Sequence, residues 1–288
     1  MRLPLRGAGG EPIDFARTLR SHGCAELPPA SIPDDNSFYA VGLRLDGRVR
    51  RVTITAHLDE LHVLVAGPKP GARARAQLTA AVRRMFRLDE DFAPFYAAIA
   101  NDPSLSWAAS GAGRMLAAPT VFEDVIKTIC TTNCAWSGTV RMVSALVNEL
   151  GSGAFPEPGI MSKAPPSFYR DKARAGYRGA YLKALAKDVA SGSLNLELLR
   201  PEHGLPDADV EERLLALPGV GPYACAHIMM LLGRYHRLIF DSWTRPAYLR
   251  VTGKRRASDR SIERAFRPYG AFAGLAFWLT LTRGWVAG

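Results

Sequence analysis

Two features of the sequence have the residue types and the spacing to do chemistry. The first is Pro218-Gly219-Val220-Gly221-Pro222, which lies between two apolar helical patterns. Glycine permits backbone angles that other residues rarely adopt and lets N–H groups approach a ligand closely. Pro222 suits the first turn of a helix, where the dipole and the free amides favour an anion. The segment is therefore either a plain helix–helix turn or a phosphate-binding hairpin.

The second feature is Asp241, which follows the apolar pair Ile239-Phe240 and lies 20 residues after Gly221. An acid at the start of a helix is often only an N-cap. The spacing also allows the helix that begins at Pro222 to return, so that Asp241 comes back to the mouth that the hairpin flanks. From the residues alone, a cap and a functional carboxylate both remain open.

The composition is that of a globular protein with a basic surface. The chain has 288 residues, 48% of them hydrophobic and 22% charged, with a net charge of +10. A chain of this length and composition can bury a core without disulfides or structural metals. The charge is consistent either with simple solubility or with a polyanionic partner.

Several classes of protein are excluded by the pattern of apolar residues. No apolar run approaches the roughly 18 to 20 residues that span a bilayer. The start of the chain has no apolar stretch typical of a signal peptide. We therefore expect no membrane association and a cytoplasmic protein.

The four cysteines, Cys24, Cys130, Cys134 and Cys225, form no CxxC pair and no regular framework. Cys130 and Cys134 are one helical turn apart, but no second pair and no nearby histidine completes a metal site. Ordinary buried thiols in a reducing compartment are the expectation.

The spacing of apolar residues predicts a mainly α protein with a small α+β N-terminal domain. A short helix around residues 11–28 precedes three strands over 37–45, 48–56 and 61–66, with a hairpin turn at Asp46-Gly47. This antiparallel meander is followed by an all-helical core. The apolar periodicity predicts helices over 72–87, 91–100, 119–131, 136–150, 167–191, 208–217, 222–233, 241–251, 258–267 and 270–283.

Two domains are expected, an N-terminal α+β domain over 1–112 and a helical core over 113–288. The last helix is expected to pack back on the N-terminal part.

The stretch 214–250 resembles the helix-hairpin-helix DNA glycosylases, with Leu217-Pro218-Gly219-Val220-Gly221 followed by the aspartate of that superfamily. Segments 122–133 and 176–182 resemble elements of the 8-oxoguanine glycosylases. The meander resembles the small domain shared by the 8-oxoguanine and inducible 3-methyladenine branches. The resemblance covers residues from about 12 to 285. It implies a helix-hairpin-helix glycosylase core that binds double-stranded DNA. We expect a monomer that is associated with the nucleoid of a prokaryotic cell.

The resemblance implies that Asp241 is the catalytic carboxylate. Cleavage of an N-glycosidic bond builds positive charge on the sugar, which a fixed anion stabilises, and the same group can orient the attacking water. Bifunctional relatives carry a lysine two residues after the second hairpin glycine, where it forms a Schiff base. This chain has Tyr223 there, and no lysine lies between Lys187 and Lys254. The departure favours a monofunctional enzyme that leaves an abasic site.

By the same resemblance, Tyr223 is expected to stack on a flipped base, the alternative being a half-buried helix residue. Trp278 matches a pocket wall, although helical cores also contain such aromatics. His227 follows Tyr223 by one helical turn and is either a pocket residue or a buried core histidine. Trp243 is a candidate for the rim. Gly274 occupies the position where the 8-oxoguanine branch carries a glutamine that reads the base, which argues against 8-oxoguanine specificity.

Residues that hold DNA are implied in the same way. Asn133 matches the asparagine that fills the space of the flipped base, although an asparagine at a helix end is also a common cap. The predicted DNA-binding residues are Asn133, Gly219, Val220, Gly221 and Arg245.

Family members hold a Na⁺ or K⁺ ion behind the hairpin through main-chain carbonyls, here by position those of Leu215, Leu217 and Val220. No cysteine follows Cys225, so no iron–sulfur cluster is expected. No other cofactor is expected.

The charge map fits a duplex. Residues 234–267 contain 10 basic and 3 acidic residues, net +7, and residues 163–188 contain 7 and 2, net +5. The leading prediction is excision of alkylated purines, because a cationic base suits an aromatic pocket. The alternatives are another modified base, whether oxidised, deaminated or a bulky phage-type pyrimidine, and a non-catalytic DNA-binding protein.

Overall fold

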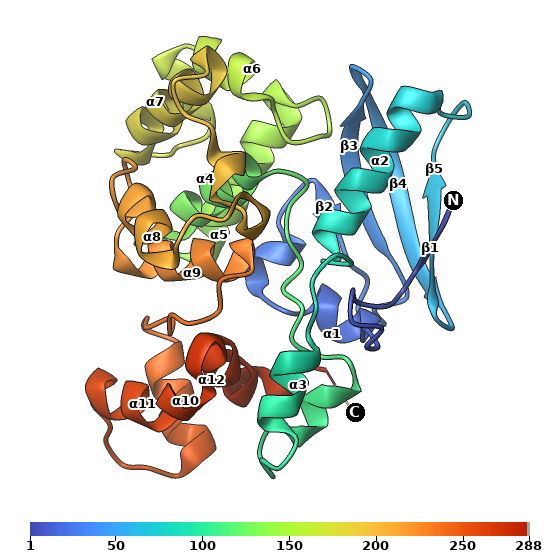
Figure 1. The fold of residues 1–288 in the computed structure, drawn as a ribbon. Helices are drawn as coiled ribbons and strands as arrows, with labels where there is room; N and C mark the ends of the chain where they lie inside the picture. The colour runs from blue at the N-terminus through green and yellow to red at the C-terminus, as the bar shows by residue number, and fades with distance from the viewer. Residues whose placement is uncertain (287–288) are drawn as a thin grey trace.

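The N-terminal part of the molecule contains a small sheet. The computed structural model describes residues 1–286. All neighbouring strands are antiparallel, in the order β1-β5-β4-β3-β2, at the right of Figure 1. The strands are β1 (Arg2–Pro4), β2 (Ala30–Ser31), β3 (Tyr39–Leu45), β4 (Arg48–His57) and β5 (Glu60–Val65). The meander β3–β4–β5 confirms the predicted one, whereas the edge strands are too short for alternation to reveal them.

The β3–β4 turn and the cover of the sheet follow from local sequence. Asp46 and Gly47 both have positive φ, 48° and 75°, as a two-residue hairpin requires. Val52 and Ile54 of β4 are fully buried. The helix α2 (Ala72–Met85) lies across this sheet and buries Leu78 against it (Figure 1). The sheet and α2 form one apolar cluster.

The remainder of the described chain is helical, as predicted. The other α-helices are α1 (Phe15–Leu19), α3 (Ala93–Ile99), α4 (Val121–Thr131), α5 (Trp136–Ala145), α6 (Pro158–Lys163), α7 (Arg178–Ser191), α8 (Asp207–Leu215), α9 (Pro222–Leu232), α10 (Thr244–Thr252), α11 (Asp259–Phe266) and α12 (Ala273–Thr282). Short 3₁₀ turns lie at Gly23–Glu26, Ser106–Ser110, Leu196–Leu199, Pro201–His203, Arg267–Phe272 and Arg283–Trp285. Single π-helical turns lie at Leu146–Leu150 and Phe168–Lys172.

Several helices begin at the capping residues expected from the sequence, but the helices predicted over 167–191 and 241–251 begin later than predicted. Thr120 and Ser258 cap α4 and α11 through their hydroxyls, and Pro222 begins α9. The predicted helix over 167–191 is interrupted, because Gly176 adopts φ +56 and α7 begins only at Arg178. The predicted helix over 241–251 begins at Thr244, after a turn that Asp241 organises.

Two further apolar clusters fill the helical part. A middle cluster joins α4 to α9, and a C-terminal cluster joins α3 to α10, α11 and α12. Helix α9 serves both, since Ile228 faces the first and Met230 the second. Apolar residues between 92 and 112 belong to the C-terminal cluster. Figure 1 shows α3 beside the C-terminal helices. The predicted domain boundary at residue 112 stays a prediction.

Among residues 1–286, no helix is both long enough and apolar enough to span a membrane.

Candidate base-excision site

One cleft gathers most of the residues that the sequence singles out. It has a volume of about 930 Å³ and lies where the end of α4, the α8–α9 turn, the start of α10 and helix α12 meet. Eight predicted site residues line it: Asn133, Gly219, Gly221, Tyr223, His227, Asp241, Trp243 and Trp278. Val220 is instead buried in the middle cluster. Arg245 lies in an adjacent groove, where it is paired with Asp259 at 2.8 Å.

The α8–α9 turn has the form of a tight hairpin, but its two glycines are needed for different reasons. Helix α8 ends at Leu215, two residues before the predicted end at Leu217. Gly219 has φ +85, and a Cβ there would lie 2.8 Å from Cδ2 of Tyr181. Gly221 has φ −101, which any residue adopts, and its Cβ position is open. The expectation that both glycines need an unusual φ is therefore wrong for Gly221.

The hairpin presents free backbone donors. The amide of Val220 donates to the carbonyl of Leu217 at 3.1 Å. In the described part of the chain, the amides of Gly219 and Gly221 have no protein acceptor, and Gly221 is exposed at the N-terminus of α9. Such amides suit an anion.

Of the three carbonyls expected to hold a monovalent cation, that of Leu217 already accepts the bond from Val220. The carbonyls of Leu215 and Val220 accept no bond from a main-chain amide among residues 1–286. The cation stays a prediction.

Asp241 is both a cap and a cleft residue. Its Oδ1 accepts hydrogen bonds from the amides of Trp243 at 2.9 Å and Thr244 at 2.6 Å, and the hydroxyl of Thr244 accepts from the amide of Asp241. The carboxylate is thus held in one orientation. Its Oδ2 accepts no hydrogen bond from any residue that the structure describes, and the half-buried side chain lines the cleft. The two readings of Asp241 from the sequence are therefore compatible.

Tyr223 and His227 form one side of the cleft, one turn apart on α9. Their ring centroids lie 6.1 Å apart, and the hydroxyl of Tyr223 lies 3.4 Å from that of Thr131. Burial raises the pKa of Tyr223 to about 12, so its hydroxyl keeps its proton. Burial lowers the pKa of His227 to about 3, so the imidazole is neutral. His227 is only 5% exposed and yet lines the cleft, so it is both a buried core histidine and a pocket residue.

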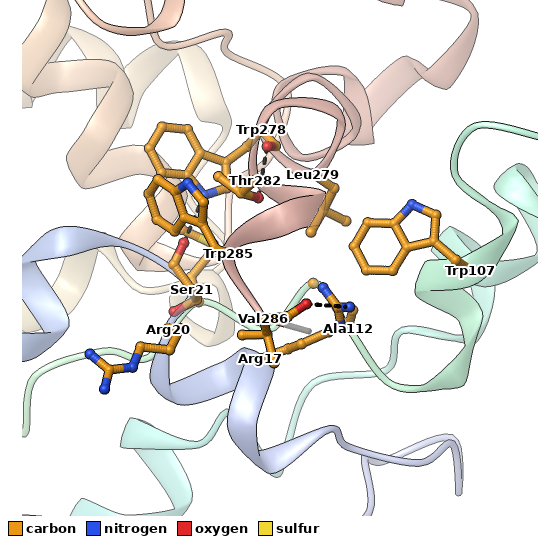
Figure 2. Close-up of a pocket in the computed structure, with 12 residues that line it drawn as sticks. Arg17, Arg20, Ser21, Trp107, Ala112, Trp278, Leu279, Thr282, Trp285 and Val286 are labelled. Carbon is orange, nitrogen blue, oxygen red and sulfur yellow. Dashed lines mark hydrogen bonds between the residues drawn. The ribbon is translucent and has the colours of Figure 1, made fainter. Parts of the chain in front are cut away.

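Three tryptophans also line the cleft. Trp278 lies 5.7 Å from Trp243 and 5.8 Å from Trp285 between ring centroids. Figure 2 shows the Trp278 indole donating its N–H to the carbonyl of Ser21, at 2.7 Å. Trp278 therefore also joins α12 to the N-terminal segment. The sequence did not single out Trp285.

Gly274 has no room for a side chain. A Cβ at this position would lie 2.0 Å from the carbonyl oxygen of Arg237, and the amide of Gly274 donates to the carbonyl of Tyr235 at 2.7 Å. The backbone of residues 235–237 thus fills the space that a side chain at residue 274 would need.

Asn133 stands at the rim in a strained turn. It follows the end of α4, has φ +44, and is exposed. Arg178 holds this turn, with Nε donating to the carbonyl of Thr132 at 3.0 Å and Nη2 to that of Asn133 at 2.9 Å. The Asn133 amide lies 3.5 Å from the hydroxyl of the exposed Tyr177. The turn therefore projects Asn133 outward.

The charges divide between the cleft and its surroundings. Asp241 is the only Asp, Glu, Lys or Arg among the described residues that line the cleft. Two of the basic residues counted in the sequence are unavailable to a partner, because Arg178 and the buried Arg234 are bonded within the fold. Besides Arg245, which is paired with Asp259, seven exposed ones lie over α10 and α11 and their flanks: Arg250, Lys254, Arg255, Arg256, Arg260, Arg264 and Arg267.

The sequence missed the N-terminal contribution to the cleft. Gly23 and Cys24 line it, as does the exposed Trp136. The segment around Gly23 has no periodicity and no motif, so nothing local indicates that it meets α9, some 200 residues later.

Solved structures share this fold over the full chain. A 3-methyladenine DNA glycosylase from Archaeoglobus fulgidus superposes with a TM-score of 0.73 at 19% identity, over 100% of this chain and 99% of that one. An 8-oxoguanine glycosylase/lyase from Clostridium acetobutylicum gives 0.70 at 19%, over 95% and 94%. Its complex with double-stranded DNA, in which cytosine lies opposite 8-oxoguanine, gives 0.67 at 18%, over 94% and 92%.

No protein-family model matches the sequence, and no curated protein is significantly similar to it. The likeness to the solved structures extends through the sheet, the hairpin and the last helix, since it covers almost the whole of each chain. The chain has the fold of the helix-hairpin-helix DNA glycosylases.

Proposed function

We propose that this protein is a monofunctional DNA glycosylase. It binds double-stranded DNA as a monomer, takes a modified base into the cleft and hydrolyses its N-glycosidic bond. The observation that carries the proposal is Asp241, whose Oδ1 is fixed by two amides while Oδ2 is free in an aromatic cleft. A carboxylate held in this way stabilises positive charge on the sugar and needs little reorganisation. The solved structures with the same fold are glycosylases, one of them bound to DNA.

The absence of lyase activity rests on the lining of the cleft. Schiff-base formation needs an amine at the sugar, and no lysine is among the cleft residues that the structure describes. Tyr223, at the position of the lysine, keeps its proton and is no substitute for an amine.

Alkylated purines are the proposed substrates because of the charge and the aromatic lining of the cleft. Asp241 contributes one negative charge, while Tyr223, Trp243 and Trp278 contribute ring faces. A cationic base is attracted by both and is already activated as a leaving group. The alternative, a bulkier modified base, is supported by the volume of about 930 Å³, which is near the upper end for small-molecule sites.

A panel of duplexes tests this function, each with one modified base, incubated with protein and then treated with alkali to cleave at abasic sites. We expect cleavage after alkali for duplexes with alkylated purines and none without alkali. Borohydride added during the reaction is expected to trap no covalent complex. Cleavage without alkali, or efficient trapping, would contradict the monofunctional assignment, and cleavage of no duplex would contradict the glycosylase.

A further inference from the structure

Three side chains with metal-binding atoms meet beneath the cleft. His22 and Cys24 flank the start of the 3₁₀ turn Gly23–Glu26, and His227 comes from the middle of α9. One ligand atom from each lies within 4.8 Å of the other two. All three are buried, with exposed fractions of 3%, 7% and 5%.

The two histidines leave buried nitrogens without partners. The Nε2 of His22 donates to the carbonyl of Leu116 at 2.7 Å, which leaves its Nδ1 as an acceptor, and this Nδ1 has no hydrogen-bond partner. The Nε2 of His227 is likewise buried and unpartnered. Buried polar atoms normally have partners. A histidine whose far nitrogen is bonded to a backbone carbonyl is also the usual form of a metal ligand.

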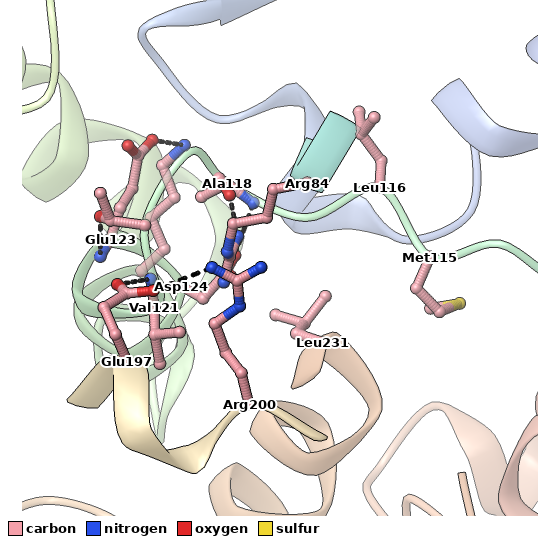
Figure 3. Close-up of polar contacts among 12 residues, drawn as sticks. Arg84, Met115, Leu116, Ala118, Val121, Glu123, Asp124, Glu197, Arg200 and Leu231 are labelled. Carbon is pink, nitrogen blue, oxygen red and sulfur yellow. Dashed lines mark hydrogen bonds and ion pairs between the residues drawn. The ribbon is translucent and has the colours of Figure 1, made fainter. Parts of the chain in front are cut away.

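Apart from Asp241 in the cleft, the charged groups around this cluster are already paired. Figure 3 shows Asp124 held by Arg84, at 2.9 Å, and by the amide of Ala118, at 2.8 Å. Lys127 is paired with Glu123 at 2.7 Å. Arg87, the other cation facing His22, is paired with Glu90. Asp124 is therefore not free to become a ligand. Because the nearby cations are each paired with a carboxylate, they repel an incoming divalent ion only weakly.

We propose that His22, Cys24 and His227 bind one Zn²⁺ ion, with a water molecule from the cleft as the fourth ligand. Two imidazoles and one thiolate are ligands that zinc prefers. Zinc bonds of about 2.0 Å to nitrogen and 2.3 Å to sulfur place the ligand atoms of a tetrahedral site about 3.5 Å apart, so the side chains close by about 1 Å on binding. Cys24 gives up its thiol proton to solvent as the Zn–S bond forms.

The fourth position faces the cleft because Cys24 and His227 both line it. The ion would join the N-terminal segment to α9, the helix that begins at the hairpin. The same segment is bonded to α12 through Ser21 and Trp278. Zinc would therefore fix the floor of the cleft where its two walls meet. This proposal does not depend on the glycosylase activity.

Metal binding to the purified full chain tests the site directly. Protein stripped with a chelator and dialysed is titrated with Co²⁺ and, separately, with Zn²⁺. We expect one ion per chain and a thiolate-to-cobalt absorption band in the near ultraviolet. The Cys24→Ala variant should lose the band and bind Zn²⁺ about 100-fold or more weakly, since even an outer-shell change costs 10- to 100-fold.

The matched control is Cys225→Ala, which removes another buried thiol from α9, one that lies 3.9 Å from the carbonyl of Glu211. It should keep both the band and the zinc affinity. If Cys24→Ala does not fold by circular dichroism, His22→Gln replaces it, with the expected outcome of weakened zinc binding. The absence of the cobalt band in folded wild-type protein would overturn the proposal. So would a band that is unchanged in Cys24→Ala, or one that is lost in Cys225→Ala.

Discussion

The two walls of the cleft are built in different ways. The C-terminal wall contains Tyr223, Asp241, Trp243 and Trp278, and its side chains supply a charge and large ring faces. The N-terminal wall contains the segment at Gly23 and the turn at Asn133, and hydrogen bonds to its backbone hold it in place. Under the proposed function, we expect the C-terminal wall to carry out the chemical step, and the N-terminal wall and the hairpin to hold the DNA. Substitutions in the first should lower the rate of excision, and those in the second should lower affinity or base extrusion.

The largest effect is expected for Asp241→Asn. The amide can still cap α10 through its oxygen, so the turn should persist, whereas the charge that stabilises the transition state is lost. We expect single-turnover excision to fall about 100-fold or more, with duplex affinity within a few fold. A variant that keeps more than about a tenth of the rate, which is only about 1.4 kcal/mol, would show that the role of Asp241 is wrong. The exposed Asp209 on α8 provides the control variant, Asp209→Asn.

Substitution of the two hairpin glycines should have different effects, one on the stability of the fold and the other on DNA binding. Gly219→Val places a β-branched residue at φ +85 against Tyr181 and should lower the free energy of unfolding by at least about 2 kcal/mol. Gly221→Val meets no neighbour and an ordinary φ, so stability should change by less than about 0.5 kcal/mol.

The bulk added by Gly221→Val would nevertheless stand where a phosphate must approach. Affinity should fall about tenfold for damaged and undamaged duplexes alike, because phosphate contacts carry no base information. Thermal unfolding and salt-titrated binding measure the two effects. Unchanged affinity, or a loss confined to the damaged duplex, would show that the hairpin is not a phosphate anchor.

A smaller effect is expected at Asn133. Asn133→Ala removes the side chain that fills the space of the flipped base and should lower excision about tenfold, or about 1.4 kcal/mol. Alanine is also strained at φ +44, whereas glycine is not. Asn133→Gly therefore serves as the control for the backbone: it should restore stability but not excision. Full excision by Asn133→Gly would show that the Asn133 side chain has no role in holding the DNA.

The smallest effect is expected for Tyr223→Phe, which keeps the ring and loses only the 3.4 Å contact with Thr131. The free energy of unfolding should fall by less than about 1 kcal/mol, and excision should change about threefold at most. Tyr223→Ala removes the ring and should reduce excision much more. Equal activities for the two variants, measured as single-turnover rates, would contradict stacking by Tyr223.

The contrast between the walls also explains what could be predicted from the sequence. The hairpin and Asp241 lie within 24 residues of each other in a contiguous pattern of helices, turn and cap. Helical periodicity and capping rules therefore predicted where they lie. The two segments of the N-terminal wall, at Gly23 and Asn133, lie about 200 and about 90 residues before the hairpin in the chain. No local pattern encodes contacts over such separations. The spacing of the cysteines gives no sign of the metal-binding trio for the same reason, because His22 and Cys24 lie about 200 residues before His227 in the chain.

The roles of the two glycines show a second limit. The motif is symmetric in sequence, so both glycines were expected to need an unusual φ. Gly219 is distinguished by its φ of +85 and by the contact that a Cβ would make there with Tyr181 of α7 and Ile129 of α4. The π-helical turn Phe168–Lys172 and the positive φ of Gly176 likewise interrupt the apolar pattern that predicts one helix over 167–191.

The central claim is that the cleft releases a base and leaves the strand intact. The most direct test is to incubate the protein with duplex DNA methylated on its purines and to identify by mass spectrometry what enters solution. The account predicts free methylated purine bases, intact strands until alkali is added, and no release by Asp241→Asn. Strand breaks without alkali, or no free base from methylated or otherwise modified DNA, would contradict it.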